Sequence, residues 1–171
     1  WFNVFLLMLI FGGIILDKLG VRMTGLGAAT VMVIGTAIKY WAVSTDSLEG
    51  QTLFGLDAQV LWASIGFAIF AIGVEVAGIT VSKIIVKWFK GKELATAMGM
   101  EMAMARIGTA LALGFSVPIA KATGAVDVSR PVLVALIGLC IGLISFIVYV
   151  MMDKKLDASE ATGLVEEKNP E

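Results

Sequence analysis

Five long apolar runs dominate the sequence and limit what the chain can fold into. They lie roughly at residues 1–16, 23–43, 58–82, 94–119 and 131–152. A helix of about 20 apolar residues crosses the hydrocarbon core of a bilayer. We therefore predict an all-α polytopic membrane protein with five spans. The composition agrees, because 58% of the residues are apolar and 16% are charged, whereas soluble domains have about 25% charged residues.

Basic residues predict which loops face the cytoplasm, since Lys and Arg concentrate on that side in short loops. They occur between the first two runs, between the third and fourth runs, and after the fifth. Residues 44–57 carry acids and no bases, and only Lys121 and Arg130 depart from the pattern. This orientation places the C-terminal tail in the cytoplasm. We expect a helix bundle over residues 1–152 and a polar cytoplasmic linker over residues 153–171.

A charged turn separates the first two runs, with the pattern Gly-x-x-x-Asp-Lys-x-Gly-x-Arg. Its members are Gly13, Asp17, Lys18, Gly20 and Arg22. Glycine at these positions allows close helix approach and a tight turn. Asp17 at a helix carboxyl end and Arg22 at a helix amino end are each unfavourable toward their own helix dipole. The amino terminus of another helix is a better partner for Asp17. An ordinary loop that sets topology is the alternative.

Residues 82–99 resemble an elbow at the membrane surface. Trp88 and Phe89 suit the headgroup level, and four lysines surround them. Glu93 begins the next helix near its positive end. We expect Trp88 and Phe89 to act as an interfacial anchor.

Glu75, Glu101 and Arg106 are charged residues deep inside the predicted spans. Glu75 lies twelve residues before Lys87, and Arg106 lies fourteen after Lys92, about 18 and 21 Å along their helices. Both charges therefore reach a similar depth near the middle of the bilayer, where charges are costly and usually functional. We expect Arg106 to hold a carboxylate and Glu75 an amine or a proton. Glu101 is a candidate for structural hydrogen bonding or for coupling.

Several kinds of function are not expected from the composition. Histidine is absent, which removes the common zinc motifs, Ser-His and Cys-His nucleophile pairs and histidine haem ligands. The net charge of −1 provides no basic field for nucleic acid. We therefore expect no enzyme, no metal, no cofactor and no nucleic-acid partner.

The charged turn closely resembles the signature of the major facilitator superfamily. Further strings resemble a group of lysosomal dipeptide transporters within it and their bacterial relatives: Gly73-Val-Glu75, Trp88-Phe-Lys-Gly-Lys-Glu-Leu94 and Met104-Ala-Arg-Ile-Gly108. This resemblance implies a twelve-helix carrier, of which the chain would supply helices two to six of the N-terminal half. The first helix and the C-terminal half would be its partners. The turn would act in gating, and Glu75 with Arg106 would bind peptide termini.

The sequence also departs from some proton-coupled relatives. Residues 70–73 lack an arginine before the glycine, and the glycine-proline pattern of antiporters is missing around residues 108–114. Facilitated movement is therefore favoured over drug antiport. We expect transport of small zwitterions, above all dipeptides, through a bacterial plasma membrane or a lysosomal membrane. The alternatives are an organic-anion carrier that needs Arg106 but not Glu75, and a non-transporting membrane interaction protein in which the two residues only fix helix packing.

Overall fold

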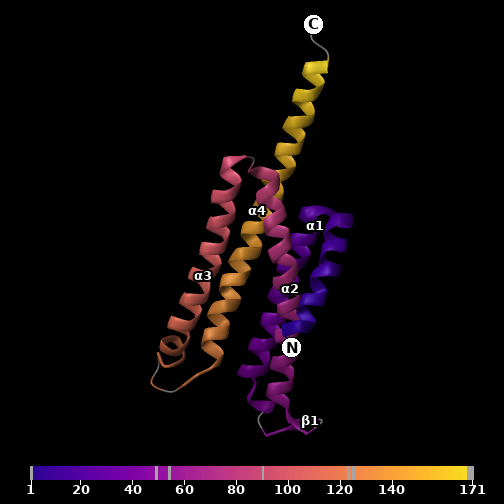
Figure 1. Ribbon diagram of the computed structural model, residues 1–171. Coiled ribbons are helices and arrows are strands. Elements are labelled where there is room, and N and C mark those ends of the chain that lie inside the picture. Colours follow the sequence, from indigo (N-terminus) through magenta and orange to yellow (C-terminus); the bar gives the residue numbers. More distant parts are fainter. Residues whose placement is uncertain are drawn as a thin grey trace.

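The computed structural model describes residues 2–48, 50–53, 55–89, 91–122, 124 and 126–168, with only the backbone described for residues 2–9, 47, 92 and 159–168. The described part of the chain contains four long helices (Figure 1). They are α1 Phe2–Ser44, α2 Ala58–Trp88, α3 Lys92–Ala120 and α4 Ser129–Lys168. Each contains a stretch long and apolar enough to cross a membrane. The predicted all-α membrane architecture is confirmed.

A short connection joins α1 to α2. It consists of a 3-10 turn, Asp46–Leu48, and a hairpin of two strands, β1 Thr52–Leu53 and β2 Leu56–Asp57. The strands are antiparallel, with Thr52 opposite Asp57 and Leu53 opposite Leu56. Asp57 then caps α2 by accepting a hydrogen bond from the backbone N–H of Gln59.

Gly20 divides α1 into two parts. Its φ of 76° and ψ of 170° are not helical, and this conformation is essentially restricted to glycine. The chain reverses its direction there (Figure 1). The first two predicted spans are therefore the two parts of α1, and the other three correspond to α2, α3 and α4.

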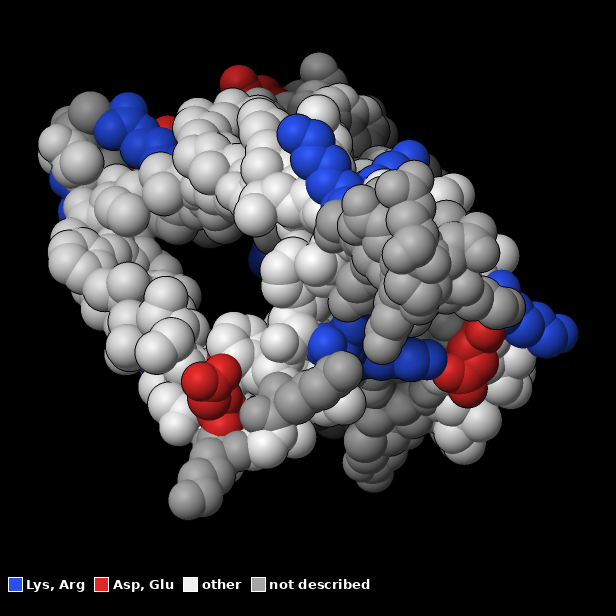
Figure 2. Space-filling model, turned by 90° about the horizontal axis from the view of Figure 1, so that it is seen from above, with Lys and Arg blue, Asp and Glu red and all other residues white. Residues whose placement is uncertain are grey.

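The connections separate into two ends (Figure 1). The turn at Gly20, the carboxyl end of α2, the start of α3 and the exit of α4 lie at one end, and the hairpin, the carboxyl end of α3 and the start of α4 lie at the other. Figure 2 looks onto the first end and shows Lys, Arg, Asp and Glu side chains around its rim. We call it the basic end, because it contains most of the basic connections on which the orientation was predicted.

Glycines bring α1 and α2 into backbone contact. A Cβ atom added to Gly66 would lie 2.7 Å from the carbonyl oxygen of Gly35, and one added to Gly73 would lie 2.9 Å from that of Ala28. Real Cβ atoms do not approach so closely, so neither position accepts a side chain without movement of the helices. Small residues at membrane helix interfaces allow this kind of packing. The α1–α2 pair is thus the closely packed part of the bundle.

α4 continues beyond the predicted end of the bundle at residue 152. The helix extends to Lys168 and projects past the other helices (Figure 1). Its residue Asp153, expected to begin a solvated linker, is only 1% exposed. The first residues of the expected linker therefore belong to the packed bundle, because they bind side chains of α1 and α2 that are described below.

Candidate functional site

A buried carboxylate at the basic end connects three helices. Asp153 of α4 accepts hydrogen bonds from Arg22 Nε of α1 at 2.6 Å and from Lys87 Nζ of α2 at 2.8 Å. The indole N–H of Trp88 donates to the same carboxylate at 3.2 Å. Arg22 Nη2 also donates to the backbone carbonyl of Asp153 at 2.9 Å. Burial of this acid is possible because each carboxylate oxygen has a donor.

Asp157 extends this arrangement by one helical turn. Residues four apart lie on the same face of a helix, so Asp157 also faces Arg22 and Lys87. It forms an ion pair with Lys87 Nζ at 3.0 Å and a second one with Arg22. We call Arg22, Lys87, Trp88, Asp153 and Asp157 the Asp153 cluster. Its two cations and two anions balance, and it joins α1, α2 and α4.

The residues of the charged turn have different positions. Asp17 pairs with Lys83 of α2 at 2.7 Å, but the two side chains are 77% and 44% exposed, and such surface pairs contribute little. Lys18 is exposed and forms no ion pair with the described residues. No described atom lies within 4 Å of a Cβ added at Gly13, so the close helix approach expected there stays a prediction. A Cβ added at Gly12 would lie 3.1 Å from Val76 Cγ2, because that residue faces α2.

Trp88 and Phe89 lie where α2 ends. Both are exposed, as an interfacial anchor requires. Trp88 also packs against Tyr149 of α4, with ring centroids 6.3 Å apart. Its indole therefore connects α2 to α4 in addition to any contact with lipid headgroups.

Glu75 of α2 is half-buried, and Arg106 of α3 is exposed. Glu75 follows Gly73 by two residues, which is a rotation of about 200°, and Gly73 is buried against α1. Arg106 is exposed and precedes Gly108 by two residues, while Gly108 lines a cavity of about 900 Å³ among the four helices. Neither Glu75 nor Arg106 has an ion pair within the described part of the chain. The structure thus does not bring the two together as a helix-locking pair.

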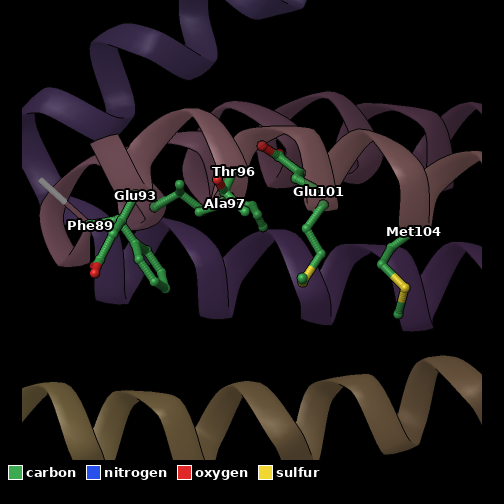
Figure 3. A pocket seen from close by; sticks show the side chains of 9 residues that line it. Phe89, Glu93, Thr96, Ala97, Glu101 and Met104 are labelled. Carbon is green, nitrogen blue, oxygen red and sulfur yellow. The ribbon is translucent and has the colours of Figure 1, made fainter. Parts of the chain in front are cut away.

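Glu101 lies at a different place on α3. Both of its carboxylate oxygens accept from the Ser82 hydroxyl of α2, at 3.2 and 3.4 Å. It borders an open groove of about 890 Å³ between α2 and α3 (Figure 3). The groove is lined by Val81, Ile85, Phe89, Glu93, Thr96, Ala97, Met100, Glu101 and Met104. We call it the α2–α3 groove.

The described residues contain no group of three or more His, Cys, Asp or Glu side chains placed to hold a metal ion.

The sequence analysis did not identify Asp153 and Asp157 as site residues. The available signal was two acids one turn apart, immediately after an apolar run that ends on the same side as the basic turns. Those acids could have been matched to Arg22 and Lys87.

The fold and this site define an integral, polytopic all-α membrane protein whose helices are joined by an ion cluster at one end. The chain is similar to curated proteins named lysosomal dipeptide transporter MFSD1. It is 35% identical to the Danio rerio protein over 113 residues, which are 64% of this chain and 21% of that protein. The Homo sapiens protein is 34% identical with the same coverage. The Gallus gallus protein is 43% identical over 63 residues, 35% of this chain and 14% of that protein.

The resemblance predicted from the motifs is thereby confirmed. The chain spans about a fifth of the length of the Danio rerio and Homo sapiens relatives. No family model and no solved structure matches the chain.

Proposed function

We propose that the chain forms part of a carrier that moves small zwitterionic solutes, most specifically dipeptides, across a membrane by alternating access. The observation that carries this proposal is the position of Glu75 and Arg106. They are opposite charges at similar depth on the neighbouring helices α2 and α3, with no ion-pair partner in the described part of the chain. Intramembrane charges of this kind usually line a solute pathway. The names of the similar proteins support dipeptides as the solutes.

Each charge has a defined role in this proposal. The planar guanidinium of Arg106 binds the solute carboxylate through two parallel hydrogen bonds. The carboxylate of Glu75 receives the solute ammonium group. In this proposal the solute lies between this bundle and a second wall outside these 171 residues. Such midplane sites are typical of carriers built from two halves that rock about the bound solute.

The Asp153 cluster gives this bundle a way to move as one body. It fastens α1, α2 and α4 at the end where the charged turn lies. Asp17, whose carboxylate is largely exposed, stays available for the amino terminus of a helix in the opposing half. The turn then acts in gating. The membrane is that of the lysosome or the bacterial plasma membrane, and no residue has a catalytic role.

The test is binding and uptake by the complete protein. Ligands that bind the folded state raise the unfolding midpoint by mass action. We expect dipeptides to raise it, and we expect Arg106→Ala to abolish both this shift and uptake. Arg130→Ala is the matched control, because Arg130 pairs with Asp127 at the far end of the bundle. Normal uptake by a folded Arg106→Ala protein would overturn the proposal.

Blocked dipeptides separate the proposal from an organic-anion carrier. An N-acetylated dipeptide retains the carboxylate but lacks the ammonium group. A zwitterion carrier should bind it weakly, and Glu75→Gln should reduce binding of the free dipeptide only. Equal uptake of both compounds, unaffected by Glu75→Gln, would assign the protein to organic anions.

A further inference from the structure

The α2–α3 groove follows α3 from Glu93 to Met104, a length of roughly 16 Å or three helical turns. Its walls are mainly apolar. Ala97, Met100 and Met104 lie on the α3 side, and Val81 and Ile85 lie on the α2 side. Figure 3 shows Met104 projecting from α3 on the open side of the groove. The groove therefore has the shape and the lining of a surface for another helix.

Because of Glu101, whatever occupies the groove should also carry a positive charge. Its hydrogen-bond donor in the structure is the neutral hydroxyl of Ser82, and no cation pairs with it among the described residues. Glu101 lies nine residues into α3 from Lys92, about 13 Å along the helix axis. At that depth an ionised carboxylate is costly without a cationic partner. Ser82 occupies one side of the carboxylate and leaves its remaining lone pairs for such a partner.

We propose that the α2–α3 groove receives a membrane helix from outside these 171 residues of the same polypeptide, and that a Lys or Arg on that helix pairs with Glu101. Two observations select this occupant. The relatives are about five times as long as the aligned segment, so further helices are available. Among the described side chains that line it, the groove offers two acidic groups, Glu93 and Glu101, and no basic one. Methionines adapt to the shape of an incoming partner.

Two methionines provide a matched pair for the first test. Met100 and Met102 are both 64% exposed, but only Met100 lines the groove, and they point about 160° apart on α3. Each is replaced in turn by the photo-crosslinking residue p-benzoylphenylalanine in the complete protein in lipid nanodiscs, and the adducts are mapped by mass spectrometry. We expect position 100 to attach to a peptide from outside residues 1–171 of the same molecule, and position 102 to attach to lipid.

Other adducts at position 100 would overturn the proposal. Lipid alone would mean that the groove faces the bilayer, and a peptide from a second molecule would mean a contact between copies. Loss of the adduct on addition of a dipeptide would identify the groove as a solute site. These readouts do not depend on transport, so the inference and the proposed function can fail separately.

A charge exchange tests the pairing. Glu101→Lys should lower the unfolding midpoint, because it places two cations together. The exchange is completed by changing the Lys or Arg found in the crosslinked helix to Glu, which should restore most of the loss. Ser82→Ala retains the carboxylate and should leave the crosslink unchanged. An additive loss in the double variant would overturn the pairing.

Discussion

Arg22 in α1 donates from its Nε atom to the carboxylate of Asp153 in α4 at 2.6 Å, across 131 residues of sequence. The partner of this arginine is therefore inside the bundle. The resemblance had implied a gating turn, with the opposing half of the carrier supplying a partner for Asp17. The structure gives these two charged residues of the turn different positions: Arg22 is fixed within the bundle, and Asp17 remains exposed.

Removal of the buried carboxylate should destabilise the bundle strongly. Asp153→Ala leaves Arg22 and Lys87 without their central acceptor, and we expect a loss of roughly 2 to 4 kcal/mol, since both cations keep some contact with solvent. Asp157→Ala removes a half-exposed acid and should cost about 1 kcal/mol or less. Denaturant titration in mixed micelles measures both. Equal small losses would show that the Asp153 cluster does not hold the helices together.

Addition of a methyl group at the α1–α2 contact should also destabilise. Gly66→Ala places a Cβ against the backbone of Gly35, and overpacking of this kind typically costs about 1 to 3 kcal/mol. Gly78→Ala on the same helix is the control, because nothing lies within 4 Å of its added Cβ. That change should be neutral or stabilise by up to about 1 kcal/mol. The prediction fails if the two unfolding curves shift alike.

The turn at Gly20 should reject other residues. An alanine there must adopt a φ of 76° and a ψ of 170°, at a cost of about 1 to 3 kcal/mol. Gly27→Ala in the same helix, at a position with open space for a Cβ, is the control. The unfolding midpoints of Gly20→Ala and Gly27→Ala, measured by thermal unfolding, compare the two changes. A Gly20→Ala protein as stable as the control would mean that the turn has another geometry.

Acid should weaken the start of α4. Asp127 accepts from the hydroxyl and backbone N–H of Ser129 and from Arg130, and these hydrogen bonds lower the pKa of its carboxyl below the usual value. A lowered pKa contributes stability that is complete above the unfolded-state pKa of about 3.9 and is lost as the pH falls through the folded-state pKa. The unfolding midpoint of the wild type should therefore fall below pH 4.

Asp127→Asn provides the control for this pH dependence. An asparagine still accepts hydrogen bonds at the helix start, but it does not titrate. The difference between the wild type and the variant should shrink between pH 5 and pH 2. A constant difference over that range would exclude Asp127 as its source.

Much of the fold could be predicted from local patterns. Apolar runs at residues 58–82 and 94–119 became α2 and α3 with ends within a few residues, because span length follows from bilayer thickness. The end of α4 could not be read in this way. Asp153 is polar and suggests solvent, but its donors come from two distant helices. The contact at Gly12 could not be read either, since the helix rotation that places Gly12 against Val76 depends on packing and not on the local motif.

The candidate site was predictable in part. Glu75, Arg106 and Glu101 are visible because charges stand out in apolar runs, and similar depth follows from counting residues to the shared elbow. Their directions depend on how each helix rotates against its neighbours. The contact between Glu101 and Ser82 requires two helix faces to meet, which no spacing along one helix specifies.

The balanced charges of the Asp153 cluster have an electrical consequence. A membrane potential does about 2.3 kcal/mol of work on each unit charge moved across 100 mV. Arg22 and Lys87 offset Asp153 and Asp157, so displacement of the whole cluster within the field moves no net charge. Under the proposed function, voltage dependence would then arise from the solute and from charges elsewhere in the protein, such as Glu75, Arg106 and Glu101. Neutralisation of Asp157 alone would make the same end of the protein respond to voltage.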